Sequence, residues 1–114
     1  MLPKEKRIKK RKDFEIIFKN SKSLRNGLFI LKVAKNSLQT SRFGFIVNQK
    51  VSKKAVVRNK VRRRLVAVVK DIEKNIKPGI DLVFIALSGI EKKEFLEIKE
   101  AVKTALVRVG ATIK

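Results

Sequence analysis

The apolar positions of this chain change their spacing along its length, and each change predicts a different element. Phe14, Ile17 and Phe18 are spaced as one face of a helix, and an acidic residue precedes them. This pattern is typical of a short amphipathic helix, which we expect over residues 13–20.

Strand patterns come next. Asn26-Gly27 predicts a two-residue hairpin turn, because both residue types tolerate positive φ. The turn would join a short segment at 22–25 to the apolar run 28–34. Residues 42–47 alternate, and the side chains expected on one side of that strand are Phe43, Phe45 and Val47. These segments predict an antiparallel sheet of two or three strands.

The second half of the chain predicts two helices and one strand. Seven apolar residues between positions 54 and 76 fall within an arc of about 120° on a helix: Val57, Val61, Leu65, Val68, Val69, Ile72 and Ile76. Ser52 is the expected N-cap of this helix, and Pro78-Gly79 is the expected stop. The apolar run 80–87 predicts a buried strand, and residues 93–109 predict a last helix. The order α-β-β-β-α-β-α predicts an α+β fold, a single-domain two-layer sandwich of one sheet with helices.

Length and composition narrow the class of protein. With 114 residues, 44% of them hydrophobic, the chain suits one folded core. Residues 1–12 contain seven Lys and Arg, and we expect a flexible basic arm there, followed by one domain over 13–114. The absence of Cys and His excludes disulfides, thiolate or histidine zinc sites, Cys nucleophiles and His-based triads. With no secretory signal and no membrane span, a cytoplasmic protein is expected.

Positive charge is concentrated in the first part of the chain. Residues 1–64 contain 21 Lys and Arg against three acids, a net charge of +18, of the +20 carried by the whole chain. A chain that needed charge only for solubility would mix the signs over its surface. The concentration predicts a surface that binds a polyanion, and nucleic acid is the favoured one.

The predicted long helix carries the most informative group of cations. Arg58, Asn59, Arg62 and Arg63 share one arc of about 140° beside the apolar stripe, whereas Lys60 and Arg64 point elsewhere. No acidic residue occurs between Glu15 and Asp71 to offset them. Arginine forks suit phosphate oxygens, so this arc predicts RNA or DNA contact.

A catalytic site within the polypeptide is the weaker hypothesis. Asp81, followed by Glu91-x-Lys93, has the residue types of a nuclease metal site, which needs carboxylates converging on Mg²⁺. The spacing of Ser88 and Glu91 instead matches a helix capping box. We therefore expect no catalytic residue and no metal ligand in the chain itself.

These motifs resemble the protein subunit of bacterial ribonuclease P. The resemblance rests on Arg-Asn-Lys-Val-Arg-Arg at 58–63, preceded by Gly-Phe-Ile-Val at 44–47 and a Lys-rich turn at 50–54. Asp13-Phe14-x-x-x-Phe18 is similar to the opening helix of that family. Two departures stand out. The basic face ends earlier than in the family, at Arg64-Leu65, and Lys32 stands where the family often has an aromatic residue facing RNA.

The resemblance implies a role in tRNA maturation. In this family a catalytic RNA subunit, with Mg²⁺ held mainly by RNA, removes the 5′ leader of precursor tRNA, and no protein oligomer or membrane is required. It also implies a left-handed βαβ crossover. Residues implied to bind the RNA subunit are Arg58, Asn59, Lys60, Arg62, Arg63, Lys53 and Lys54. Residues implied to bind the single-stranded leader are Phe14, Phe18, Lys32 and Ile30.

Alternatives remain open at this level. A small basic ribosomal protein has the same composition, and a protein-only nuclease would use Asp81, Glu91 and Lys93. Phe14 and Phe18 also fit simple core packing, because aromatic residues at i and i+4 commonly anchor a helix.

Overall fold

The sheet arranges its strands in an order different from their order along the chain. This computed structural model describes residues 2–112; Met1 of the predicted arm and residues 113–114 of the predicted domain lie outside it. The strands lie side by side as β1-β2-β4-β3, and their bounds are β1 (Lys22–Arg25), β2 (Phe29–Lys35), β3 (Arg42–Ile46) and β4 (Ile80–Ala86). The expectation of a purely antiparallel sheet is wrong for β3, because β4 lies between β2 and β3 and pairs with β3 in parallel.

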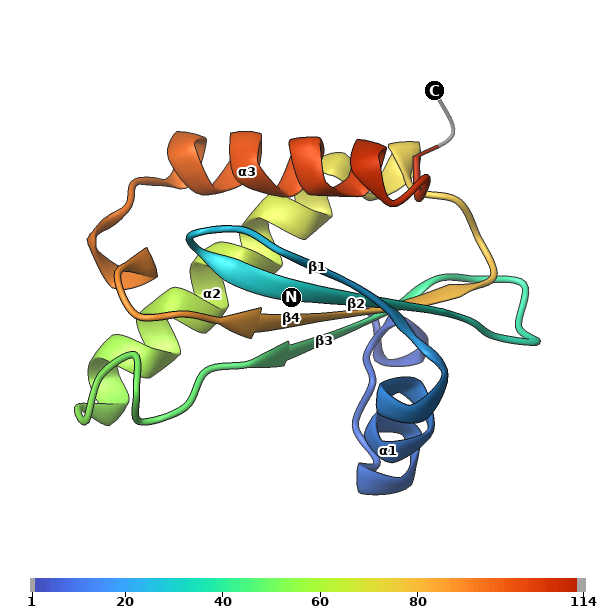
Figure 1. Ribbon diagram of the computed structural model, residues 1–114, viewed down its shortest axis with the longest axis horizontal. Coiled ribbons are helices and arrows are strands. Elements are labelled where there is room, and N and C mark those ends of the chain that lie inside the picture. The colour runs from blue at the N-terminus through green and yellow to red at the C-terminus, as the bar shows by residue number, and fades with distance from the viewer. Residues whose placement is uncertain (1, 113–114) are drawn as a thin grey trace.

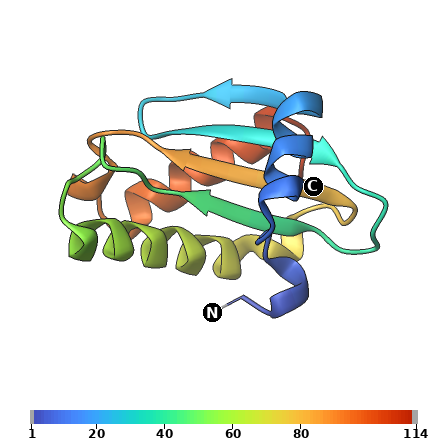
Figure 2. The same ribbon diagram turned by 90° about the horizontal axis from the view of Figure 1, so that it is seen from below.

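Three helices cover the two faces unequally. Figure 1 shows α2 (Ala55–Ile72) and α3 (Phe95–Arg108) on one face of the sheet and α1 (Arg11–Asn20) on the other. The predicted α+β class and the order α-β-β-β-α-β-α are confirmed. The parallel strands β3 and β4 are joined through α2 by a left-handed crossover, an exception to the usual handedness that the family resemblance implied (Figure 2).

The main core lies between the sheet and the two helices α2 and α3. From the sheet it takes Phe29, Leu31, Phe43, Leu82 and Phe84, all at most 1% exposed. The apolar stripe predicted for α2 is confirmed, because its buried side chains are Val61, Leu65, Val68, Val69 and Ile72. None of the helices within residues 2–112 is long and apolar enough to cross a membrane.

The helix ends differ from the predicted ones. Lys54, not Ser52, is the N-cap of α2, and the Ser52 hydroxyl oxygen accepts the Lys54 N–H at 3.2 Å just outside the helix. The expected capping box of Ser88 and Glu91 is replaced by one formed at α3 by Glu94 and Glu97. Several residues spaced like caps lie close to each helix start, so sequence spacing alone does not select between them.

The N-terminal segment packs against the fold where the sequence predicted a flexible arm. Leu2 and Ile8 are buried, at 2% and 6% exposure. The Ile8 N–H donates to the Phe43 carbonyl at 2.9 Å, and Lys6 forms an ion pair with Glu73, also at 2.9 Å. The two apolar residues among the cations provide the burial that a fully charged arm would lack.

Asn26, and not Gly27, shapes the hairpin between β1 and β2. The Asn26 side-chain oxygen accepts the N–H groups of Leu28 and Phe29 at 2.8 and 2.9 Å. Gly27 does not have positive φ, and the last strand pair is Arg25 with Ile30. The predicted two-residue turn is therefore wrong, because the side chain of Asn26 closes a longer loop.

Candidate nucleic-acid interface

The predicted arc of cations lies along α2, the helix beside β3 (Figure 2). Asn59 and Arg63 are exposed, and Arg58 and Arg62 are half-buried. Arg58 donates to the Ser52 carbonyl at 3.0 Å, and Arg62 donates to the Asn59 side-chain oxygen at 2.9 Å. A guanidinium has five N–H donors, so one such bond orients the fork and leaves others for phosphate oxygens.

The other predicted cations of this region are also on the surface. Lys53 and Lys54 are exposed at the start of α2, and Lys60 is exposed on a different side of that helix from the arc. Arg64 differs from all of these, because it donates to the carbonyls of Glu91 and Lys93 at 3.4 and 2.9 Å. It ties α2 to the segment before α3 and so has a structural role.

The second sheet face is covered by α1 at one end only. There Ile17 packs with Ile8, Ala34 and Val83 in a small separate core. Phe14 is half-buried and lies directly on Gly44, where a Cβ atom would stand 2.8 Å from the Phe14 Cε1 atom. The core-packing interpretation of Phe14 is therefore supported by contacts.

Phe18 and its neighbours lie on the uncovered part of this face. Phe18 is 42% exposed, and its ring centroid is 6.3 Å from that of Phe14. The Lys32 ammonium lies 5.9 Å from the Phe18 ring centroid and donates to the Ser23 hydroxyl at 2.8 Å. Ile30 lies two residues along β2, half-buried on the same face. The structure thus brings Phe14, Phe18, Lys32 and Ile30 to one surface.

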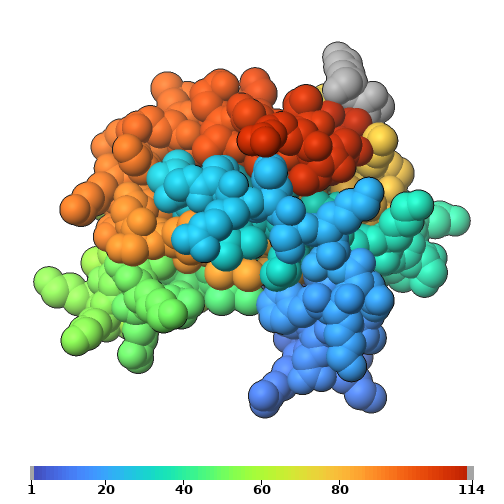
Figure 3. Space-filling model, in the orientation of Figure 1, coloured from blue at the N-terminus to red at the C-terminus, as the bar shows by residue number. Residues whose placement is uncertain are grey.

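This surface continues beyond the residues that sequence reasoning singled out. Figure 3 shows it hollowed between α1, in blue, and the green segment that begins α2. At that far end is a pocket of about 550 Å³, whose lining includes Arg25, Ile30, Asn48, Lys50 and Ile85. The position of Arg25 follows from strand alternation once its pairing with Ile30 is known. The positions of Asn48 and Lys50 depend on tertiary folding, and no local pattern predicts them.

A buried ion pair fixes the strands beneath α1. Asp81 is 3% exposed and accepts two hydrogen bonds from Arg42, at 2.9 and 2.7 Å, and one from Asn36 at 2.8 Å. Arg42 also contacts Asp13 of α1 at 3.5 Å. The hydrogen bonds to Asp81, together with the negative charges of both carboxylates, raise the pKa of Arg42 above its usual value.

The nuclease hypothesis finds no support in this geometry. Asp81 lies near the start of β4, whereas Glu91 lies beyond the end of that strand and accepts the Gly89 N–H at 2.7 Å. Five further strand residues, 82–86, extend from Asp81 to the end of β4, a length of about 17 Å. Within residues 2–112 no three acidic side chains form a group that suits a metal ion.

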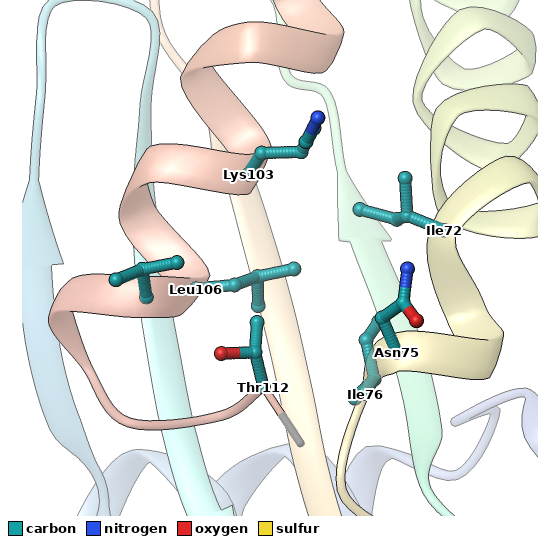
Figure 4. Close-up of a pocket in the computed structure, with 7 residues that line it drawn as sticks. Ile72, Asn75, Ile76, Lys103, Leu106 and Thr112 are labelled. Carbon is teal, nitrogen blue, oxygen red and sulfur yellow. The ribbon is translucent and has the colours of Figure 1, made fainter. Parts of the chain in front are cut away.

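Another pocket lies at the opposite end of α2 from the basic arc. Figure 4 shows Ile72, Asn75 and Ile76 across from Lys103 and Leu106 of α3. It encloses about 160 Å³ and its walls are mainly apolar. None of the predicted site residues lines it.

Comparison with known proteins places this geometry in a family. The model of a family described as Ribonuclease P matches residues 2–110. The ribonuclease P protein component of Clostridium botulinum strain 657 is 38% identical over 108 residues, covering 94% of this chain and 96% of the relative. That of Synechocystis is 41% identical over 87 residues, covering 75% and 70%.

Solved structures agree in fold. The RNase P protein of Staphylococcus aureus superposes with a TM-score of 0.84 at 28% identity, covering 93% of this chain and 96% of that one. The RNase P protein of Thermotoga maritima gives 0.81 at 32% identity, covering 90% and 96%. Sequence and fold agree over nearly the whole chain, and the chain belongs to the ribonuclease P protein family.

Proposed function

We propose that this chain binds the catalytic RNA subunit of ribonuclease P and the single-stranded 5′ leader of precursor tRNA. In doing so it assists endonucleolytic removal of the leader to give the mature tRNA 5′ end. The observation that carries the proposal is the presence of two RNA-compatible surfaces on one small domain. One is the basic arc on α2, and the other is the open sheet face beside α1.

The α2 surface suits folded RNA. Its cations project from one rigid helix, so they present donors at fixed spacing to phosphates and riboses. Arg58 and Arg62 are each oriented by a hydrogen bond within the protein, which lowers the entropy lost on binding. The residues proposed to bind the RNA subunit are Arg58, Asn59, Lys60, Arg62, Arg63, Lys53 and Lys54.

The open sheet face suits an unpaired strand. Phe18 offers an exposed ring for stacking, and Lys32 lies beside it to neutralise a phosphate. Ile30 continues the apolar floor, and the Phe14 ring lies beside that of Phe18, with centroids 6.3 Å apart. From Ile30 the same face continues into the pocket that Asn48 and Lys50 line, so the proposed path runs from α1 toward Lys50. We propose that the leader follows this path.

Catalysis is assigned to the RNA subunit. The acidic residues that a protein Mg²⁺ site would need do not fit, because Asp81 is neutralised by Arg42 and Glu91 lies at the other end of β4. We propose that Mg²⁺ is held mainly by RNA and that the polypeptide positions both RNAs.

A pair of variants tests this assignment. Replacing Arg62 and Arg63 together with Ala should weaken assembly with the RNA subunit for every substrate and reduce the salt dependence of binding by about two phosphate contacts. Changing Phe14 to Ala should weaken binding of leader-bearing precursor tRNA and spare leaderless tRNA. Melting curves come first, because Phe14 also packs on Gly44. If a stable Phe14 variant binds both tRNAs in the wild-type ratio, the leader surface is misassigned.

A further inference from the structure

A second pocket lies where the N-terminal segment, β3 and α2 meet. It encloses about 240 Å³. Its lining includes three cations, Arg7, Lys9 and Arg62, together with the apolar side chains of Phe14, Phe45 and Val66. It is separate from the open sheet pocket near Lys50, with which it shares no lining residue.

The pairing of the N-terminal segment with β3 explains why the pocket exists. Arg7 forms a parallel bridge with Phe43, and Ile8 donates its N–H to the Phe43 carbonyl. The chain then leaves the edge of the sheet to begin α1 at Arg11. Phe45 lies two residues further along β3, so its backbone N–H and carbonyl face the same edge. The pocket is the space left between this edge and α2.

The charge of the pocket favours an anion. Its described lining contains three cations and no acidic residue. Desolvation, with the nearby charges of Arg7 and Lys4, lowers the pKa of Lys9. An anion between these cations would relieve their mutual repulsion, and the guanidinium of Arg62 offers a fork that matches phosphate.

The walls favour a planar apolar group beside that anion. Phe45 is half-buried and stacked on Phe84, with ring centroids 5.8 Å apart, so its position is fixed. Phe14 and Val66 complete the apolar wall. The volume of about 240 Å³ lies below the range of about 300–1,000 Å³ common for drug-sized ligands. A single nucleobase satisfies the size, the apolar walls and the backbone groups of Phe45.

We propose that this pocket holds one unpaired RNA nucleotide, with its base against Phe45 and Val66 and its phosphate between Lys9 and Arg62. The inference rests on the proposed function, because it assumes that Arg62 meets RNA. It adds a base-binding site at the junction of the α2 arc with α1, and Phe14 is shared between this pocket and the proposed leader surface. The nucleotide comes either from the RNA subunit or from the leader, and the experiment below separates the two sources.

The absence of cysteine allows a direct test. A single Val66→Cys variant carries a short photocrosslinker, and a Val107→Cys variant, in the pocket of Figure 4, is the control. Each is crosslinked to the RNA subunit alone and to the assembled particle with leader-bearing or leaderless precursor tRNA. We expect Val66→Cys to label one or two adjacent unpaired nucleotides, and the labelled RNA identifies the source. Labelling that is scattered, confined to paired nucleotides or no greater than the control overturns the proposal.

A second comparison does not depend on the packing of Val66. Lys9 and Lys12 are both exposed, and only Lys9 lines the pocket. Lys9→Ala should weaken binding of the crosslinked RNA about fivefold near physiological salt, by removing one phosphate contact. Lys12→Ala should have a smaller effect, and equal effects of the two variants contradict the proposal. If the wild-type protein binds neither RNA, the proposed function itself fails, whereas normal binding with no labelling at residue 66 refutes only the pocket.

Discussion

The contact between Gly44 and Phe14 makes a sharp test of how α1 is seated on the sheet. A Cβ atom at residue 44 would lie 2.8 Å from Cε1 and 3.0 Å from Cζ of Phe14, and 3.4 Å from Cβ of Ile8. Nonbonded carbon atoms prefer about 3.5–4.0 Å, so the ring must move. We predict that Gly44→Ala destabilises the protein and displaces the ring of Phe14.

The expected cost follows from this geometry. Adding one methyl group to a well-packed site costs about 1–3 kcal/mol, and we expect about 1–2 kcal/mol here because Phe14 is only half-buried. For a domain of 114 residues this corresponds to a fall in Tm of about 4–8 °C. The backbone contributes little, because Gly44 does not have positive φ.

Thermal unfolding measures this effect, with two companion variants. Gly27→Ala is the matched control, because a Cβ there meets no atom within 4 Å and should leave Tm nearly unchanged. Adding Phe14→Leu to Gly44→Ala removes the two closest ring atoms and should restore part of the stability that Gly44→Ala loses. This packing of α1 is refuted if Gly44→Ala melts at the wild-type temperature. It is also refuted if the double variant loses as much Tm as the sum of the losses measured for Gly44→Ala and Phe14→Leu separately.

Three further predictions concern separate contacts. Asp81→Ala leaves the largely buried guanidinium of Arg42 without its main partner, and it should lower the free energy of unfolding by about 2–4 kcal/mol in denaturant titration. The control Glu15→Ala removes an exposed ion pair with Arg11 and should change the free energy of unfolding by less than about 0.5 kcal/mol. Phe18→Ala should weaken binding of leader-bearing precursor tRNA by about 1–3 kcal/mol, while Ile16→Ala, on the same helix and 57% exposed, should leave the affinity unchanged. Arg64→Ala should cost about 1–2 kcal/mol of stability through its two lost carbonyl contacts, with no loss of affinity for RNA at matched folded fraction.

The sequence predicts those parts of this fold that depend on local periodicity. The apolar stripe of α2 and the alternation of Phe43 and Phe45 in β3 are confirmed, because each follows from the period of its own element. The insertion of β4 between β2 and β3 depends on contacts between distant segments, and no spacing within one strand indicates it. The handedness of the crossover came from the family resemblance alone.

In the candidate site, too, the sequence predicts the features that belong to one element and not those that depend on contacts between elements. The arc on α2 is a property of one helix, so the sequence locates it correctly. The seating of Phe14 on Gly44 and the placement of Lys32 beside Phe18 join different elements and needed the fold. The sequence does not predict the packing of the N-terminal segment, because seven cations within 1–12 mask the apolar Leu2 and Ile8. Those two residues were the only local signal.

Reconstituted cleavage of precursor tRNA tests the central claim most directly. Purified protein, the cognate RNA subunit and both together are incubated with leader-bearing precursor tRNA and Mg²⁺ at moderate salt, and the cut position is mapped at single-nucleotide resolution. We predict that the protein alone leaves the substrate intact and that the two components together cut at the mature 5′ end. Cleavage by the protein alone, lost in Asp81→Ala under conditions where that variant remains folded, would contradict it.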